Sequence, residues 1–483
     1  MTSRRDFMKV VGMSSAAWVV GRRQEQAAAA VSKPNIVFVM ADDLGWQELG
    51  CYGQKRIKTP HIDRMAAEGM RFLEYYAGSA VCAPSRCNLM TGKHGGHATV
   101  RNNFEIKHPD PSVFGGQLPL PAGEPTIAET LKRHGYATGC FGKWGLGGVG
   151  SSGDPLDKGF DRFYGYNCQR HAHNLYPRYL VSDRKHERLP GNTRGQTGQT
   201  YAPQRIADEM LTFIREHKNG PFFVYYPTVI PHLALQAPEA EIAAYRGQWE
   251  ETPYHGQSYL PHPTPRACYA AMITFLDKQM GRLFALLEEL HIDDNTLVFF
   301  TSDNGTTYLK KQVDYEFFES VGPLRGLKGS LHEGGLRVPL VVRWPGQIAA
   351  ATTSNHIGAH YDMPATLAEI AGTTFHDGAD GLSMAPTLLG HSDRQDLHHH
   401  LFWDFAGYGG QLAVRLGKWK GIKKNLSKTP NAPLELYDLE GDLGEQDNVA
   451  GRYPEIVKQI ETIMHKGRSM PDFEPFRFGT YSN

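Results

Sequence analysis

Short runs of β-branched and aromatic residues, separated by helical patterns, constrain the fold of this chain more than any other feature. The runs cover residues 35–40, 137–141, 221–226, 296–301 and 338–343. Each run is apolar throughout rather than at alternate positions, which predicts strands buried on both faces. Capped helices are expected between runs, as at 59–68, 126–134 and 266–290. This alternation predicts an α/β fold with a large doubly wound, mostly parallel sheet.

A second pattern begins near residue 390. A polar segment at 394–400 precedes three further apolar stretches and one helical pattern, at residues 401–405, 411–423, 434–439 and 454–465. Strands followed by a single helix predict a small antiparallel sheet. We therefore expect a large α/β domain at residues 31–393 and a smaller C-terminal α+β subdomain at 394–483.

The first 30 residues resemble a twin-arginine export signal. Arg4 and Arg5 precede an apolar stretch at 10–20, and four alanines follow at 27–30. The stretch is interrupted by polar and glycine residues and falls short of the ~20 residues that a membrane span needs. We expect the twin-arginine machinery to export the chain to the periplasm or beyond. Removal of the segment, with five basic and two acidic residues, leaves a mature chain near −3.

The overall charge argues against one class of partner. Lysine plus arginine equals aspartate plus glutamate at 51 each, so no overall field attracts nucleic acid or acidic lipid. We expect no nucleic-acid partner. The six cysteines contain no C-x-x-C pair and no zinc spacing, so they predict no metal site of their own.

Polar residues follow several of the predicted strands. Asp42 and Asp43 come directly after the first run, and Asp303 and Asn304 come after the run that ends at residue 301. Ligands of open α/β sheets gather at the carboxyl ends of the strands. Acidic pairs after strands are more often helix caps or turn formers, but two such pairs are harder to explain in that way. Three carboxylates and a carboxamide suit Ca²⁺ or Mg²⁺ better than Zn²⁺.

The pentapeptide Cys-Ala-Pro-Ser-Arg at residues 82–86 is the most specific motif. Pro84 suits the first turn of a helix that runs to about Gly92. Position 82 then lies where free backbone N–H groups attract an anion such as sulfate. The alternative is that Cys82 is one more small buried residue.

This pentapeptide matches the C-x-P-S-R signature of type I sulfatases, in which the cysteine is oxidised to formylglycine. The chain resembles that family in motif order from Lys33 onward. Further matching segments lie at residues 34–45, 92–94, 142–144, 231–232, 302–305, 324–335 and 436–439. The resemblance implies an alkaline-phosphatase-like fold, with residues 31–393 as the catalytic domain of a sulfuric ester hydrolase.

The resemblance also implies cofactors, partners and roles. The Ca²⁺ ligands would be formylglycine at position 82 with Asp42, Asp43, Asp303 and Asn304. Formylglycine requires a formylglycine-generating enzyme, and its hydrated form attacks sulfur, releases the alcohol and then expels sulfate, which is covalent catalysis. The expected substrate is a sulfated carbohydrate, of galactose or N-acetylgalactosamine type.

The remaining catalytic residues are also implied by the family. Arg86 would support the formylglycine diol, Lys143 and Lys328 would hold sulfate oxygens, and His232 would face the leaving oxygen. Taken alone, each lysine would be read as a solvated surface residue, but their strand-end and glycine-flanked positions favour a functional role.

One departure from the family stands at Gly145, where members commonly have histidine two residues after the lysine. Loss of a general base costs about 10² to 10⁴ in rate. His171 and His173 are the local candidates to replace it, and their segment resembles one found in polysaccharide-acting members. Arg101 and Asn102 are candidates to bind a polar sugar. Ordinary loop residues are the alternative at each of these positions.

Two other functions stay open on the sequence alone. A phosphoester hydrolase of the same superfamily would need a serine or threonine nucleophile and histidine-rich zinc ligands, neither of which stands at the matching positions. An exported, non-catalytic carbohydrate-binding protein would keep Cys82 unconverted, and Gly145 favours that alternative. A test for the formyl group separates it from a sulfatase.

Overall fold

A ten-stranded mixed sheet runs through the residues that the computed structural model describes, 33–107 and 114–481. Across the sheet the strands are β11 (Thr352–Ser354), β2 (Met70–Phe72), β10 (Leu340–Arg343), β9 (Thr296–Ser302), β1 (Asn35–Ala41), β8 (Phe222–Pro227), β4 (Ala137–Lys143), β5 (Arg162–Tyr166), β6 (Tyr179–Ser182) and β7 (Lys185–Arg188). The neighbours from β9 to β5 are parallel, and antiparallel pairs adjoin them on both sides. The prediction of a mostly parallel sheet is confirmed. The predicted export signal lies outside the described residues.

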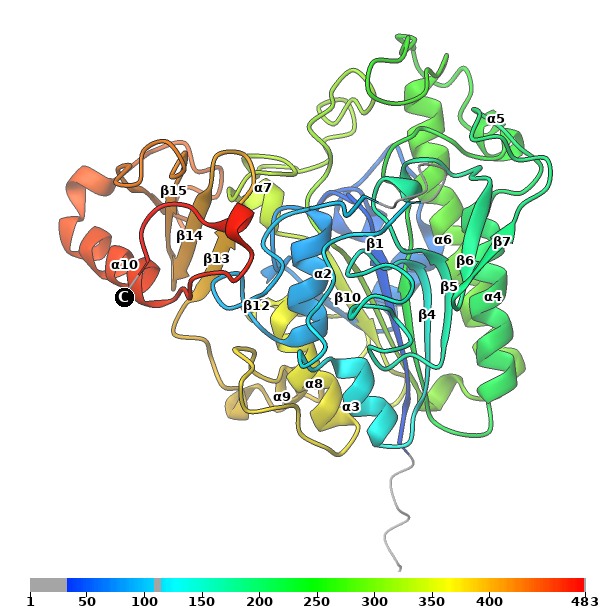
Figure 1. Ribbon diagram of the computed structural model, residues 1–483, viewed down its shortest axis with the longest axis horizontal. Coiled ribbons are helices and arrows are strands. Elements are labelled where there is room, and N and C mark those ends of the chain that lie inside the picture. Colours follow the sequence, from blue (N-terminus) through cyan, green and yellow to red (C-terminus); the bar gives the residue numbers. More distant parts are fainter. Residues whose placement is uncertain (1–32, 108–113, 482–483) are drawn as a thin grey trace, which may run out of the picture. The chain divides into compact units, whose positions relative to one another are not determined.

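Each central strand contributes to two hydrophobic cores, which explains its continuous apolar sequence. In β1, Val37 and Val39 belong to one core, and Ile36 and Phe38 belong to the other. One face is covered by α1 (Pro60–Ala67), α4 (Ala202–His217) and α6 (Pro265–Glu289), and the other by α2 (Cys82–Thr91), α3 (Ile127–Arg133) and α8 (Met363–Ile370) (Figure 1). This is the doubly wound arrangement that the sequence predicts.

The predicted helices at 59–68, 126–134 and 266–290 correspond to α1, α3 and α6. In α3 the side chain of Thr126 accepts from the Glu129 N–H, and the Glu129 carboxylate accepts from the Thr126 N–H. This reciprocal capping box begins the helix. The run at 338–343 forms β10, which is antiparallel to β9. Periodicity predicts a buried strand but carries no information on its direction.

The C-terminal strands form a separate four-stranded antiparallel sheet, made of β13 (Leu401–Phe405), β14 (Gln411–Leu416), β15 (Trp419–Lys423) and β16 (Glu435–Asp438). Helix α10 (Pro454–Lys466) packs on one face through Ile460 and Met464. The stretch at 411–423 is two strands rather than one, because Gly417 at φ +57° makes a turn between them. The antiparallel sheet and its helix are as predicted.

Buried ion pairs join the small sheet to the loop before β10. Glu333 opens α7 (Glu333–Leu336), and its carboxylate lies 2.6 Å from Lys420 Nζ and 2.7 Å from Arg337 Nε. Burial alone would raise the pKa of Glu333, but Lys420, Arg337 and Arg415 outweigh burial and lower that pKa below its ordinary value. The chain from Lys33 on clusters as one compact unit, and the domain boundary at 393/394 stays a prediction.

Candidate active site

Cys82 is the first residue of α2, at the carboxyl edge of the sheet. The Ala83 N–H beside it donates to Asn103 Oδ1 at 2.9 Å, and Val81 supplies no side-chain cap. The helix ends at Gly92, whose φ of +69° closes it in the left-handed region. The predicted helix therefore exists with the predicted end. Cys82 Sγ lies 3.4 Å from Asp42 Oδ1.

The pairing of β1 with β9 brings two acidic segments together. Because Ala41 is in register with Ser302, the residues that follow each strand emerge side by side. The Asp43 N–H donates to Asp303 Oδ1 at 3.1 Å, and Asn304 Nδ2 donates to Asp43 Oδ1 at 2.7 Å. The side chains of Asp42, Asp43, Asp303 and Asn304 are all buried. The strand-end cluster expected from the sequence is present.

Three cationic side chains balance these carboxylates. Arg86 Nη2 lies 2.8 Å from Asp303, and Lys143 Nζ lies 2.6 Å from Asp42. Lys328 Nζ lies 2.8 Å from Asp43 and 3.6 Å from Cys82 Sγ. The formal charges of the three acids and three bases cancel. Buried charges this close together tolerate loss of a partner poorly, at about 3–5 kcal/mol each.

The donors at this site suit a hard divalent cation. Asp42, Asp43, Cys82 and His232 each offer a ligand atom, all within 4.8 Å of one another. Asn304 Oδ1 is buried and has no hydrogen-bond partner within the described residues. A buried carbonyl oxygen of this kind needs a partner, and a cation beside the carboxylates supplies one. The residues present therefore fit a metal held mainly by oxygen.

The thiol of Cys82 is unreactive as it stands. Burial is the largest influence and raises its pKa to about 12, although Lys143 and Lys328 lower it in part. At neutral pH the sulfur is therefore protonated, and a protonated thiol is a weak nucleophile and a weak metal ligand.

Cys82 opens into a cavity of about 150 Å³. Its other lining residues are Asp43, Asn103, Gln169, His173, His232, Leu233, Tyr259, Thr307, Tyr308, Leu309, Lys328 and Tyr408. Acidic, cationic and neutral polar groups thus meet in one small space, with three tyrosines around it. A tetrahedral anion with an attached organic group matches this mixture.

Two neutral imidazoles stack inside the cavity. The rings of His173 and His232 have centroids 4.8 Å apart and lie within 11° of parallel. Burial is the largest influence on both, and it lowers each pKa well below the ordinary value; the neighbouring Lys143 and Lys328 act in the same direction. His232 Nδ1 lies 2.6 Å from the Leu233 carbonyl oxygen. A neutral imidazole must donate from Nδ1 there, which leaves Nε2 as an acceptor.

Three residues predicted at this site lie elsewhere. His171 lines a different cavity with Tyr179 and stacks on Phe114 at 4.9 Å. Arg101 is buried against Asp404 at 3.0 Å, so its charge is used within the fold. Asn102 does not line the cavity, and its carboxamide oxygen accepts from the next residue's N–H at 2.9 Å. None of the three residues therefore lines the cavity with Cys82, and sugar binding by Arg101 and Asn102 stays a prediction.

Several lining residues were missed by the sequence reasoning. Gln169 and Asn103 are close in sequence to residues that were predicted to act at the site, but neither was itself predicted. Tyr308 follows the Asp303 motif closely, so its position could have indicated a role. Tyr408 comes from the loop between β13 and β14, in the small sheet, and no pattern links it to the cavity. It holds φ +48° and is 57% exposed.

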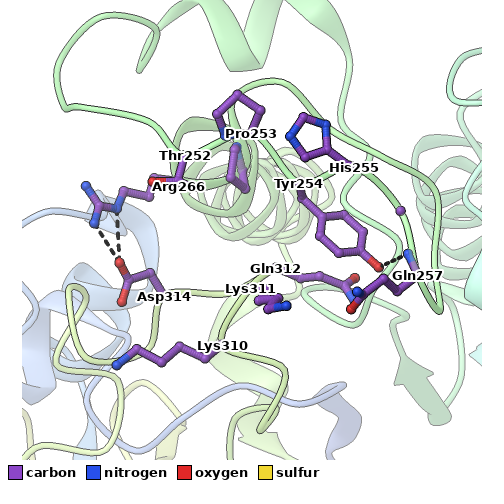
Figure 2. A pocket seen from close by; sticks show the side chains of 12 residues that line it. Thr252, Pro253, Tyr254, His255, Gln257, Arg266, Lys310, Lys311, Gln312 and Asp314 are labelled. Atoms are coloured by element: carbon purple, nitrogen blue, oxygen red, sulfur yellow. Dashed lines mark hydrogen bonds and ion pairs between the residues drawn. The ribbon is translucent and has the colours of Figure 1, made fainter.

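A second cavity, of about 690 Å³, is lined by residues 252–257, 265–266, 310–312 and 314 (Figure 2). Tyr254, His255 and Gln257 border it on one side, and Lys310 and Lys311 on the other. Both loops also border the first cavity, because Tyr259 and Leu309 line the first cavity while Gln257 and Lys310 line the second. The two cavities therefore follow one continuous pair of loops.

Comparisons with known proteins agree with this geometry. A model of the sulfatase family matches residues 34–373, and one described as N-sulphoglucosamine sulphohydrolase, C-terminal, matches residues 327–469. N-acetylgalactosamine-6-sulfatase of Rattus norvegicus is 32% identical over 474 residues, which cover 94% of this chain and 83% of that protein. Arylsulfatase A of Bos taurus is 31% identical over 511 residues, which cover 95% of this chain and 93% of that protein.

A solved structure adds the same likeness at the level of the fold. The crystal structure of Ps i-CgsB in complex with k-i-k-neocarrahexaose matches with a TM-score of 0.74 and 26% identity, over 90% of this chain and 92% of that chain. Fold and cavity together define a hydrolase of the alkaline-phosphatase superfamily. The chain belongs to the sulfatase family and is a sulfuric ester hydrolase.

Proposed function

We propose that the enzyme hydrolyses sulfate esters of a sulfated carbohydrate, through a formylglycine made from Cys82 and beside a bound Ca²⁺. The position of Cys82 carries the proposal. It opens a buried helix, lies 3.4 Å from Asp42 and 3.6 Å from Lys328, and faces the cavity. Formylglycine supplies the nucleophile that a protonated thiol does not, and a formylglycine-generating enzyme is the implied partner.

Charge balance supports a divalent cation at this site. The three carboxylates and three cations sum to zero formal charge, so a divalent ion leaves the site at +2. The singly charged sulfate ester is then attracted to the site, whereas without the ion it enters a site with no net attraction. Asp42, Asp43, Asp303 and Asn304 would hold the ion, with position 82. Once bound, Ca²⁺ polarises sulfate oxygens.

The protein's own side chains divide the remaining work. Lys143 and Lys328 hold positive charge beside position 82, where sulfate oxygens bind. Arg86 orients the Asp303 carboxylate, with Nη2 at 2.8 Å from it. His232 would face the leaving oxygen, and the hydrogen bond from its Nδ1 to the Leu233 carbonyl orients the ring.

His173 is the base that we propose for the proton transfer during sulfate release. It lines the cavity with Cys82, whereas His171 lines a different cavity, and its lowered pKa keeps it neutral. Its stacking on His232 orients the ring. Because residue 145 is glycine, the segment that follows Lys143 offers no imidazole for this proton transfer.

The aromatic rim supports a carbohydrate. Tyr308 and Tyr408 lie at the mouth of the cavity, 47% and 57% exposed, with ring centroids 6.1 Å apart. Exposed rings beside a polar pocket suit the apolar face of a sugar. The second cavity along the same loops can receive a further sugar unit, and Lys310 and Lys311 suit an anionic one. The name of the relative from Rattus norvegicus, N-acetylgalactosamine-6-sulfatase, supports a galactose- or N-acetylgalactosamine-based sugar here.

Export through the twin-arginine pathway remains part of the proposal, to the periplasm or outside the cell. None of the helices in residues 33–107 and 114–481 combines the length and apolarity that crossing a membrane requires.

Active enzyme is expected to carry formylglycine at position 82. Peptide mass spectrometry of the 82–86 segment should show the aldehyde or its hydrate, and Cys82→Ala should lose turnover while its thermal unfolding stays close to wild type. Full activity from protein with only unmodified cysteine would refute the proposal and favour a different nucleophile.

One Ca²⁺ per chain is expected, since the donors are mainly oxygens. Elemental analysis should find stoichiometric calcium, and Asp303→Ala should lose metal and activity together. Asp393→Ala is the matched control, because Asp393 is exposed and outside the site. Stoichiometric zinc, with activity restored by zinc alone, would contradict the assignment.

His173→Phe is expected to lower kcat by at least about 10²-fold, because it removes the base but keeps a ring for stacking. His171→Phe is the matched control, since its ring packs on Phe114 away from Cys82. Stopped assays with a chromogenic aryl sulfate measure both. If kcat survives in the His173 variant, the base must be His232 or a water.

Sulfated galactose- and N-acetylgalactosamine-containing oligosaccharides are expected to give a higher kcat/KM than simple aryl sulfates. Tyr408→Ala should raise KM for the oligosaccharide about tenfold, through lost ring contact. Tyr453→Ala is the control, because Tyr453 is similarly exposed but packs on Trp419. Cleavage of aryl sulfates with no activity on any sulfated sugar would count against a carbohydrate substrate.

A further inference from the structure

Gly145 leaves space that another residue fills. It lies two residues after Lys143 with φ +78°, a conformation that favours glycine. A Cβ atom added at this position would stand 2.1 Å from Gln169 Nε2 and 3.1 Å from Gln169 Cδ. The Gln169 carboxamide therefore occupies the volume that a side chain at 145 would enter.

The Gln169 carboxamide is buried and unsatisfied. The side chain is only 4% exposed, and neither Nε2 nor Oε1 has a hydrogen-bond partner within the described residues. Leaving a buried polar atom unpaired is costly because its hydration is lost without replacement, so native proteins rarely do so without a reason. The same side chain lines the cavity with Cys82 and Lys328. Its missing partner is therefore expected to come from the ligand.

We propose that Gln169 is a substrate-binding residue, whose Nε2–H donates to a sulfate oxygen and whose Oε1 accepts from a hydroxyl of the bound ligand. This inference rests on the proposed function, because it takes the sulfate ester as the occupant of the cavity. A sulfate group offers acceptors only, so it takes the amide donor, and a sugar hydroxyl satisfies the amide oxygen.

A carboxamide cannot do the work of a histidine. It has no basic nitrogen and takes no proton near neutral pH, so it binds without titrating. Gln169 therefore contributes orientation and hydrogen bonding at the position beside Lys143, while proton transfer belongs to a separate imidazole. Hydrogen bonding to the ligand and proton transfer, which one histidine at position 145 would combine, are divided between Gln169 and His173.

Gln169→Met is the sharpest test, because methionine keeps the length and volume but removes both hydrogen-bonding atoms. We expect kcat/KM for a chromogenic aryl sulfate to fall about 10- to 100-fold with formylglycine content unchanged by mass spectrometry. Gln169→Glu should fall further, because a carboxylate repels the sulfate. Asn167→Ala is the matched control, since Asn167 is an equally buried amide that lines a different cavity.

Inhibition by inorganic sulfate provides a readout that a merely structural role would not move. Gln169→Met should raise the inhibition constant of sulfate at least fivefold, with thermal unfolding close to wild type. If wild type is active but Gln169→Met keeps its kcat/KM and its sulfate inhibition within twofold, the assignment of Gln169 is overturned and the sulfatase function stands. A formylglycine-bearing wild type that cleaves no sulfate ester would instead remove the proposed function.

The shared volume has its own test. Gly145→Ala should lose at least tenfold in kcat/KM, because its Cβ displaces the Gln169 amide. Adding Gln169→Ala to it should give activity within twofold of Gln169→Ala alone, since the displaced group is then absent. A double variant whose loss is the product of both single losses would show that the two positions act independently, against the proposal.

Discussion

The balance of three buried carboxylates by three buried cations is the constraint on which the rest of this structure depends. Asp42 and Asp303 emerge side by side only because β1 and β9 are parallel and in register. Arg86 reaches Asp303 from α2, and Lys143 reaches Asp42 from the end of β4. None of these charges would be tolerated at its depth without the others. The sheet edge, the helix and the site are thus held by the same interactions.

The small sheet takes part in the site as well as in the stability of the chain. Lys420 and Arg415 reach from it into the buried cluster around Glu333, close in sequence to Lys328. Tyr408, from one of its loops, forms part of the cavity wall. Gly329 allows this approach, because a Cβ there would stand 2.4 Å from the Tyr408 ring. A ligand that touches Tyr408 and Lys328 therefore contacts one loop after a strand of each sheet, the loop after β13 and the loop after β9.

Neutral polar groups complete a site that charge alone would leave unselective. The imidazoles of His173 and His232 stay uncharged because burial and nearby lysines oppose their protonation. Gln169 is neutral by its chemistry. These groups accept or donate hydrogen bonds next to an ion cluster without changing its net charge. The absence of histidine at position 145 is then explained, because the polar side chain of Gln169 already occupies that space.

The elements whose cause is local can be derived from the order of residues alone. Continuous apolar runs predicted the central strands, capping residues predicted α3, and glycine predicted the end of α2. The strand-end acids and Cys82 were also foreseen, because parallel strands end at one edge of the sheet. The direction of β10 and the turn at Gly417 were not foreseen. An apolar run looks the same for either strand direction, and it can continue across a tight turn.

Which side chains share the cavity depends on how distant segments pack together. His171 and His173 are two residues apart, yet one packs among aromatic rings and the other stacks on His232. Arg101 was a reasonable sugar ligand by type, but its partner Asp404 is 303 residues away in the sequence. Tyr408 and Gln169 enter the site through long-range packing. Local sequence sets backbone preferences and strand ends, whereas the contacts of a buried side chain depend on segments that no local pattern specifies.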